Sequence, residues 1–313
     1  MAKENFSNQN LNSFNFNIKT ERQVGIQLNP IPMKIQITTL CALSCAASLA
    51  PAALVHHYTL DGNTTGTAVD SVGGSNGVWN GDAGDDARVA GIIAGGVAVN
   101  DENGGNGQEH FRMNLTGLNG ANALTVTGWV NIGADNNNSV YNAFFMSRDV
   151  GFDSTGDGAA DLTGQNWGLA IRDNGAPHRL DSRMNGGGLE TSPTLGTGQW
   201  YHLAMTWDGV SGSRNLYLDG TNVGSATAPI GSIVQGGEWR LSDDPALSNR
   251  ELNAILDDVA VWNEVLTPTQ IAQIESEGRN NGLNAVEALN VPEPSTAFLG
   301  LLGLGALGLR RRK

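Results

Sequence analysis

Cysteine and lysine are almost absent from this chain of 313 residues. It contains two cysteines, Cys41 and Cys45, and no lysine between Lys34 and Lys313. Both cysteines lie in an N-terminal apolar segment that we expect to be removed. The remaining chain then has no thiol, which excludes disulfides and catalysis by a cysteine nucleophile.

A basic surface is missing as well. The formal net charge is -13, and residues 53–290 hold 28 acidic residues against 10 arginines. Nucleic-acid binding needs a stripe of cations, so no nucleic-acid partner is expected. The excess of carboxylates fits an exported protein and a hard cation such as Ca²⁺. Alternatively, it only keeps a secreted domain soluble.

The N-terminal residues form two segments outside the expected fold. Residues 33–52 begin with Met33 and a lysine, continue through an apolar stretch and end in small residues, which is typical of a secretory signal peptide. Ala50 and Ala52 supply the A-x-A cleavage motif. Residues 1–32 have no apolar periodicity. We expect them to be a disordered upstream extension, with a long N-terminal region of a genuine precursor as the alternative.

The C-terminal residues 292–313 form another such segment, after an expected linker at 281–291. Its parts are Pro292-Glu293-Pro294, the uncharged run Ser295–Leu309, and the cations Arg310, Arg311, Arg312 and Lys313. The run has 15 residues, whereas a membrane-spanning helix usually needs about 20. Flanking cations tend to stay cytoplasmic, which would leave the preceding domain outside the membrane.

The order of these three parts resembles the PEP-CTERM sorting signal of bacterial surface proteins. The resemblance implies processing by an exosortase, a membrane enzyme that removes such tails. It also implies an exported protein at the cell surface, in the outer envelope or in the extracellular matrix. Until it is removed, the tail would anchor the chain in the inner membrane as a hydrophobic helix. A plain C-terminal anchor is the alternative, but it leaves the Pro-Glu-Pro unexplained.

Residues 53–280 contain short strands separated by turns. Segments such as ALTVTGWVNI and QWYHLAMTWDG alternate with stretches of Gly, Asn and Asp, which is typical of a sandwich or jelly roll. Asp219 and Gly220 predict a two-residue hairpin turn. The sequence therefore predicts one all-β domain.

One short helix is expected after the last strand. Thr267 is a good N-cap, Pro268 suits the first helical position, and Gln270 completes a capping box. Ile271 lies on the apolar face, and Gly278 is expected to end the helix.

Five segments of this domain carry a family resemblance. LVHHYTLDG, LTVTGWV, QWYHLAMTWDG, LYLDG and LDDVAVWNEVLTPTQI occur in this order. Together they resemble the concanavalin A-like, laminin G-like jelly rolls of lectins and glucanases. The resemblance implies a sandwich of two antiparallel sheets with a short capping helix.

A catalytic motif is not found. Glucanases of this fold carry a Glu-x-Asp-x-x-Glu strand, because a retaining hydrolase needs two carboxyl groups about 5 Å apart. The sequence has no such stretch. His56 and His57 are adjacent in a predicted strand, so they point to opposite faces and cannot share a metal. His202 is expected to be a packed histidine of the core. We therefore expect no enzyme, although carboxylates can still meet across the sequence.

One group of aspartates predicts calcium binding from its spacing. In FDSTGDGAADLTG, Asp153, Asp157 and Asp161 occupy positions 1, 5 and 9 of an EF-like loop. Gly164 replaces the expected final Glu, so a plain Asp/Gly turn is the alternative.

The family resemblance implies a second, structural calcium site. Its ligands would lie between the first-strand turn and the last strand, at Asp61 and Asp258. Asp257, on the opposite face of the same strand, is the fallback.

Tryptophans are the expected sugar-stacking residues. Those beside loops rich in Gly or Asn are the candidates for exposure, and those within strands are expected in the core. The loop candidates are Trp79, Trp167 and Trp239; the strand residues are Trp129, Trp207 and Trp262. Tryptophans that only anchor loops are the alternative.

These observations favour a secreted, surface-sorted and non-catalytic binding module. Its partner would be an extracellular polysaccharide or a surface protein. A polysaccharide hydrolase or lyase is one alternative, and a structural protein of the envelope or matrix is another.

Overall fold

The computed structural model describes residues 53–62, 65–82, 84–99, 109–133, 141–172, 178–184, 187–235, 237–247 and 250–290. The predicted extension, signal peptide and sorting segment lie outside these ranges.

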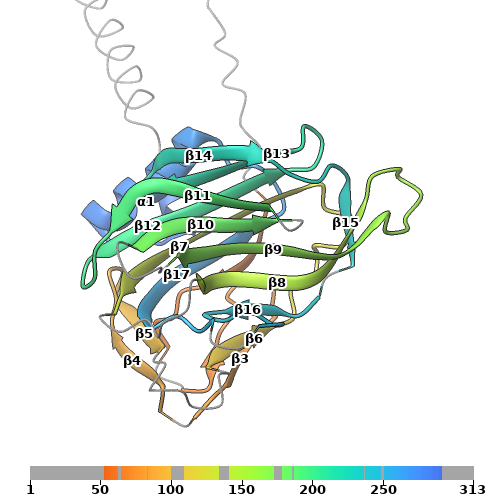
Figure 1. Cartoon of the computed structure of the whole chain (residues 1–313). Coiled ribbons are helices and arrows are strands. Elements are labelled where there is room, and N and C mark those ends of the chain that lie inside the picture. Colours follow the sequence, from red (N-terminus) through yellow and green to blue (C-terminus); the bar gives the residue numbers. More distant parts are fainter. Residues whose placement is uncertain are drawn as a thin grey trace, which may run out of the picture. The chain divides into compact units, whose positions relative to one another are not determined.

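Two antiparallel sheets form a sandwich, as expected from the sequence (Figure 1). Sheet A contains β1 (Leu54–Tyr58), β4 (Asp86–Ala90), β5 (Gly95–Val99), β7 (Ala123–Ile132), β12 (Trp200–Asp208), β13 (Ser213–Leu218), β14 (Thr221–Thr227) and β17 (Ala254–Trp262). Its order is β14-β13-β12-β7-β17-β5-β4, and β1 pairs with β17.

Sheet B contains β2 (Thr67–Ala68), β3 (Gly77–Asn80), β6 (His110–Met113), β8 (Tyr141–Asp153), β9 (Leu162–Arg172), β10 (His178–Met184), β11 (Gly187–Leu195), β15 (Ser232–Gln235) and β16 (Trp239–Leu241). Its order is β11-β10-β9-β8-β16-β6-β3-β2, and β15 pairs with β8.

The main core lies between the two sheets. In β7, Leu124, Val126 and Val130 are buried in this core, in keeping with the two-residue period of a strand. Gly128 shares their face, where a Cβ atom would come within 2.7 Å of the Phe144 ring. Close approach of sheet B therefore requires glycine at this position.

The predicted hairpin turn joins β13 to β14. Asp219 and Gly220 connect the two strands and have φ angles of 46° and 73°. Two consecutive positive φ values are those of the type I′ turn, which matches the twist of paired strands.

Two helices pack on the outer face of sheet A. Helix α1 (Pro268–Asn281) starts at the predicted capping box of Thr267 and Gln270. Its Ile271 and Ile274 join Ala204 of β12 and Trp262 of β17 in a second apolar cluster. The helices thus cover apolar side chains that point away from the main core.

The predicted end of α1 at Gly278 is wrong. The helix continues to Asn281, and Gly282 caps it with a φ of 65°. A Cβ on Gly278 would lie 2.8 Å from Cζ2 of Trp129. This glycine therefore allows the helix to approach sheet A.

Within the segment expected as a linker at 281–291, residues 285–290 form a second helix. Helix α2 (Ala285–Asn290) buries Ala285 and Ala288 in the same apolar cluster as α1. The folded domain therefore extends to Asn290, ten residues beyond the predicted boundary at 280.

A β-bulge in β17 gives two consecutive aspartates, Asp257 and Asp258, different surroundings. The register against β7 shifts between Asp257 and Ala260, and Asp258 has a φ of 46°. Asp258 consequently faces His57 of β1, with 2.6 Å between its Oδ1 and the histidine Nε2.

Candidate functional site

The outer face of sheet B carries a row of charged side chains. Trp167, Leu169 and Ile171 of β9 are part of the main core. By strand alternation, Arg172 points outward. In the strand register, Arg172 lies opposite Arg179 of β10. Alternation along β10 likewise places Arg179, Asp181 and Arg183 on the outer face. Glu190 of β11 lies opposite Asp181.

These side chains surround one aromatic ring, that of Tyr141 at the start of β8. The guanidinium carbons of Arg183, Arg172 and Arg250 lie 3.8, 5.3 and 5.4 Å from the ring centroid. Such contacts between a cation and an aromatic face are attractive. We call Tyr141, Arg172, Arg179, Asp181, Arg183, Glu190 and Arg250 the Tyr141 cluster.

Glu190 links two arginines of the Tyr141 cluster. Its Oε1 accepts a hydrogen bond from Nη1 of Arg179 at 3.0 Å, and its Oε2 accepts one from Nη1 of Arg172. The side chains of Arg172, Arg179 and Glu190 are 28 %, 39 % and 29 % exposed. Arg172 and Arg179 are therefore held by Glu190 and are still accessible to solvent.

Asp181 lies beneath this accessible layer. Its side chain is 1 % exposed, and its Oδ1 is 3.3 Å from Nε of Arg183. Burial raises the pKa of Asp181 to about 6, although Arg183 and Arg172 oppose the shift. A carboxyl group this deeply buried has no direct contact with a ligand on the surface.

The sequence analysis missed the Tyr141 cluster. Its signal is the alternation of arginines in HRLDSRM, with a further arginine at the end of NWGLAIRD. The partner positions depend on strand register, which the sequence does not show.

The expected tryptophan platforms are largely wrong. Trp167 is fully buried and Trp239 is 2 % exposed, and both belong to the main core. Their ring centroids are 5.6 Å apart. Trp79 is half-buried, and its Nε1 donates to the carbonyl of Asp82 at 3.0 Å. The three tryptophans expected in strands, Trp129, Trp207 and Trp262, are buried as predicted.

Asp258 does not fit the calcium role expected of it. Its Oδ1 lies 2.6 Å from Nε2 of His57, and its Oδ2 accepts the backbone N–H of Ala285 at 2.9 Å. Both carboxylate oxygens are therefore used inside the fold, because the bulge turns this residue toward β1.

The fallback residue, Asp257, fits better. Its side chain is fully buried, its Oδ2 accepts the N–H of Ile93 at 2.8 Å, and its Oδ1 has no hydrogen-bond partner among the described residues. Burial, together with the charges of Asp258 and Asp61, raises the pKa of Asp257 to about 8, although the hydrogen bond from the N–H of Ile93 opposes the shift. Asp61 itself is exposed and accepts the N–H of Gly95 at 2.7 Å. A divalent cation beside these carboxylates would compensate their charge.

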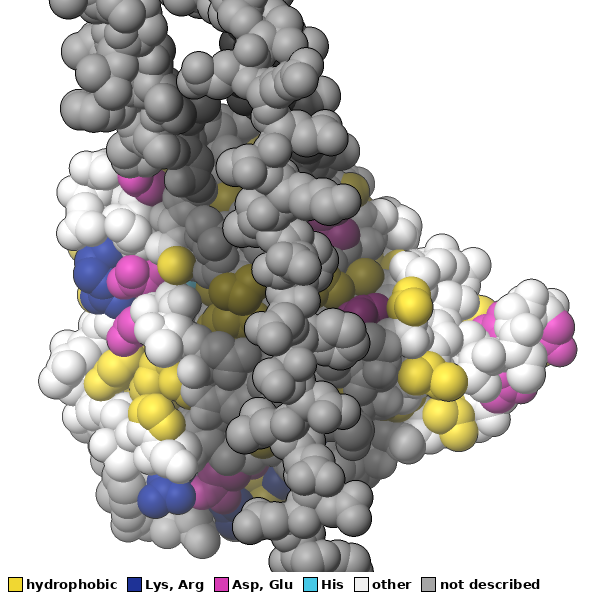
Figure 2. Space-filling model, turned by 90° about the horizontal axis from the view of Figure 1, so that it is seen from above, with side chains coloured by type: hydrophobic (Ala, Val, Ile, Leu, Met, Phe, Trp, Pro, Cys, Tyr) yellow, Lys and Arg dark blue, Asp and Glu magenta, His cyan; other side chains and the backbone are white. Residues whose placement is uncertain are grey.

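The aspartates of the loop between β8 and β9 accept backbone hydrogen bonds instead of facing a common centre. Asp153 accepts the N–H groups of Gly156 and Gly158 at 2.6 and 2.7 Å, and these bonds lower its pKa. Asp161 accepts the N–H of Ser154 at 2.7 Å, and Asp157 accepts that of Ala159 at 2.8 Å. On the face shown in Figure 2, carboxylates mark the lobe at the right, where Figure 1 places this loop. The alternative of an Asp/Gly turn describes these contacts better than an EF-like loop.

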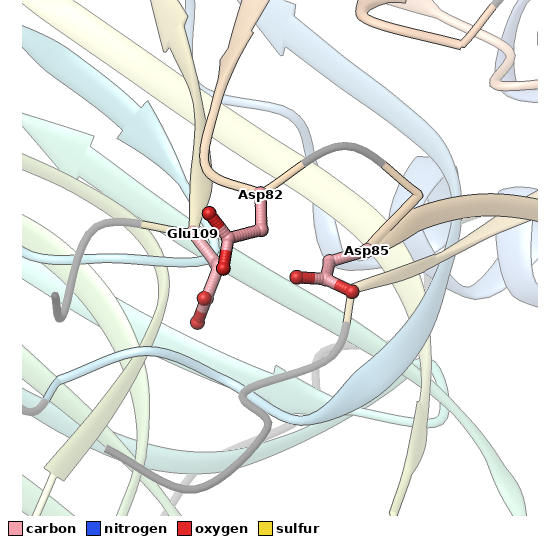
Figure 3. A group of neighbouring side chains, drawn as sticks. All are labelled: Asp82, Asp85 and Glu109. Atoms are coloured by element: carbon pink, nitrogen blue, oxygen red, sulfur yellow. The ribbon is translucent and has the colours of Figure 1, made fainter. Parts of the chain in front are cut away.

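One further acidic group was not foreseen. Asp82, Asp85 and Glu109 have carboxylate oxygens within 4.8 Å of one another, and Figure 3 shows the two aspartates pointing toward Glu109. Asp85 also lines an open cleft of about 560 Å³, together with Asn131 and Asn253. These oxygen ligands suit a hard cation. Asp82 and Asp85 come from the loop between β3 and β4, and Glu109 directly precedes β6.

A Ser–His–Asp chain is present, but the backbone N–H groups that follow its serine already donate to another side chain. Ser71 Oγ lies 3.1 Å from Nδ1 of His57, whose Nε2 faces Asp258. The neighbouring N–H groups of Val72 and Gly73 both donate to Asp70. Because these two N–H groups already donate to Asp70, they are not available to stabilise a developing oxyanion.

The other predicted histidines have structural surroundings. His56 and His57 face different carboxylates, those of Asp70 and Asp258, as their opposite directions predicted. His202 is fully buried against Trp129, with ring centroids 5.0 Å apart. Burial lowers the pKa of His202 to about 3, so this ring is neutral at physiological pH.

The sorting and cleavage residues, Pro292, Glu293, Pro294, Arg310, Arg311, Arg312, Ala50 and Ala52, lie outside the described residues. Within the described part of the chain, neither helix has the length and apolar character needed to cross a membrane.

A two-sheet sandwich with a helix after its last strand defines the class of lectin- and glucanase-like domains. The sequence model of the concanavalin A-like lectin/glucanases superfamily, Laminin_G_3, matches residues 103–272, and the chain belongs to this family. The PEP-CTERM protein-sorting motif matches residues 290–313. The family and the sorting signal expected from the sequence are both confirmed, and the signal marks an exported protein that is sorted to the cell envelope.

Solved structures show the same fold at low sequence identity. Domain 4 of AbnA, an extracellular arabinanase from Geobacillus stearothermophilus solved with arabinotriose, has a TM-score of 0.50 and 21% identity, and the match covers 71% of this chain and 97% of that one. The binding domain of Paraclostridial Mosquitocidal Protein 1 has a TM-score of 0.53 and 13% identity, covering 73% of this chain and 53% of the other.

Curated relatives match only a segment. C-reactive protein of Xenopus laevis is 31% identical over 83 residues, which are 24% of this chain and 35% of that protein. A sushi, von Willebrand factor type A, EGF and pentraxin domain-containing protein of Rattus norvegicus is 26% identical over 96 residues, 28% of this chain and 3% of the relative.

Proposed function

We propose that the protein is a non-catalytic binding module that attaches to extracellular polysaccharide after export and sorting. The observation that carries this proposal is the Tyr141 cluster, where an aromatic ring and exposed hydrogen-bonding groups share one sheet face. Sugar-binding sites combine these two features. The arabinotriose bound to the similar AbnA domain supports a saccharide ligand.

A glycan array with the purified full-length chain tests this proposal. We expect binding to at least one polysaccharide class, and loss of that binding in Tyr141→Ala. Trp79→Ala, which changes a half-buried aromatic residue outside the cluster, is the control. If the chain binds no glycan but captures a surface protein, the surface-protein alternative replaces this proposal. If it binds neither, the structural alternative replaces it.

Sorting would proceed through an exosortase that acts on the PEP-CTERM segment. Until then, the hydrophobic tail would hold the chain in the inner membrane. Mass measurement of the mature protein distinguishes a chain that ends near Pro294 from one that ends at Lys313.

Calcium is proposed as a structural ion at Asp257 and Asp61. The buried, unpartnered oxygen of Asp257 and the nearby charge of Asp61 support this site. The ion would stabilise the contact between β17 and the turn after β1. It would have no catalytic role.

A polysaccharide hydrolase is the second candidate. One observation favours it: Asp181 and Glu190 are cross-strand neighbours, and the pKa of Asp181 is raised to about 6. A raised pKa suits a general acid. The burial of Asp181 and the two arginines on Glu190 favour the binding module instead. Release of reducing ends from a bound polysaccharide, abolished by both Asp181→Asn and Glu190→Gln, would establish the hydrolase.

A further inference from the structure

Positive charge is concentrated at the Tyr141 cluster. Four of the ten arginines in residues 53–290 lie there, namely Arg172, Arg179, Arg183 and Arg250, against the carboxylates of Asp181 and Glu190. The cluster thus has two more cationic than anionic groups, whereas the same stretch of sequence has 18 more acidic than basic residues. A local excess opposite to the overall charge attracts anions to this face.

The arginines already hold a carboxylate. Oε1 of Glu190 accepts from Arg179 and Oε2 accepts from Arg172. Each guanidinium group has five N–H donors, so donors remain on both arginines. Their side chains are partly exposed, and a carboxylate from outside can reach the same donors.

The Tyr141 ring fixes this arrangement. Arg183 lies over the ring at 3.8 Å, and Arg172 and Arg250 approach it at 5.3 and 5.4 Å. Arginine stacks on aromatic faces and binds carboxylates through a planar fork, and lysine does neither as well. Positioned guanidinium groups lose less freedom on binding.

We propose that the Tyr141 cluster recognises polysaccharides that carry carboxylate groups, that is, chains containing uronic acids. The proposal deepens the binding function proposed above and rests on it. Arg172 and Arg179 bind the ligand carboxylate, and Arg183 and Arg250 contribute positive charge around Tyr141.

A purely structural ion-pair lattice would explain the same contacts. The two explanations differ for Glu190→Gln. If the ion pairs are purely structural, Glu190→Gln removes two of them and does not increase the affinity for an acidic sugar. In a recognition site, it removes a competing carboxylate and leaves both arginines for the ligand, so affinity for an acidic sugar rises.

The test compares a galacturonate trimer with its methyl ester by titration calorimetry, at low salt, on the full-length chain. The ester keeps the sugar and removes the charge. We expect the acid to bind at least about tenfold more tightly than the ester, and Arg179→Gln to weaken acid binding about tenfold. Arg279→Gln is the matched control, because this side chain is 37 % exposed but lies on α1, over sheet A. It should leave affinity unchanged.

Each outcome decides between the two claims. Equal affinity for acid and ester overturns the anionic specificity and leaves the polysaccharide-binding function intact. No binding to any acidic or neutral glycan overturns both. Tighter acid binding by Glu190→Gln supports recognition, whereas weaker binding at an unchanged melting temperature contradicts it. If Arg179→Gln does not fold, Arg172→Gln replaces it with the same expected loss.

Discussion

The two outer faces of the sandwich differ in what their side chains contact. On sheet A, Trp129, His202 and Trp262 are buried, and α1 and α2 cover this face. On sheet B, Arg172, Arg179 and Glu190 remain partly exposed around Tyr141. Both sheets alternate inward and outward residues in the same way.

Under the proposed function, this difference separates stability from binding within one sandwich. Apolar outward residues require a cover, and the capped helix after β17 provides it. Charged outward residues need no cover, and they keep hydrogen-bonding groups available to a ligand. Sheet A is therefore the face on which substitutions should cost stability, and sheet B the face on which they should change binding.

The largest expected effect is that of Trp129→Ala on sheet A. This side chain is fully buried under α1, and truncation of such a residue typically costs about 4 kcal/mol. Tyr141→Ala on sheet B should cost about 1 kcal/mol. Urea unfolding of both variants measures the two losses. Equal losses would show that sheet B is as much a structural face as sheet A.

Calcium should stabilise the chain by roughly 3 kcal/mol when its concentration is about a hundredfold above its dissociation constant. For a domain of this size, the melting temperature should rise by roughly 5–10 °C. The rise should disappear in Asp257→Asn, because the amide has no negative charge and only one oxygen, whereas the carboxylate has an unpartnered oxygen for the ion.

Two variants serve as controls for this calcium effect. Asp161→Asn and Asp258→Asn should keep the rise, since these carboxylates already accept hydrogen bonds within the fold. Loss of the rise in Asp161→Asn alone would place the ion in the loop between β8 and β9.

Asp181 should make stability depend on pH. Burial raises its pKa from 3.8 to about 6 in the folded state, against the effect of Arg183, Arg172 and Arg214 and with a small contribution from Glu190. The folded state therefore binds this proton more tightly than the unfolded chain does. The stabilisation is complete below pH 3.8 and is lost as pH rises through 6.

The expected loss between pH 4 and 7 is on the order of 2 kcal/mol. It is measured as the change with pH of the difference in unfolding free energy between wild type and Asp181→Asn. A difference that stays constant over this range would mean that the Asp181 carboxyl is not shifted.

The smallest effect concerns the helix that covers sheet A. Thr267→Ala removes the side chain that caps α1 and should lower the free energy of unfolding by about 1 kcal/mol. Thr267→Ser keeps the hydroxyl and serves as the control. Thermal unfolding that is unchanged in Thr267→Ala would show that packing alone holds the helix on the sheet.

Local features were predictable from the sequence because neighbouring residues determine them. The Asp219-Gly220 turn, the start of α1 and the buried strand tryptophans follow from backbone preference and strand period. Features that depend on distant segments were not predictable in the same way. Trp167 and Trp239 stand beside polar stretches, yet sheet packing buries both of them.

The sequence by itself determined that this is an acidic β-sandwich of the concanavalin A-like family with a C-terminal sorting signal, because motifs and strand alternation are local properties. Only the tertiary structure decided that Asp257, rather than Asp258, keeps an unpartnered oxygen, since a bulge turned one of two adjacent aspartates toward β1. It also decided that arginines from three separate segments meet at Tyr141. Register and loop packing fix such meetings, and they depend on contacts across the whole sheet.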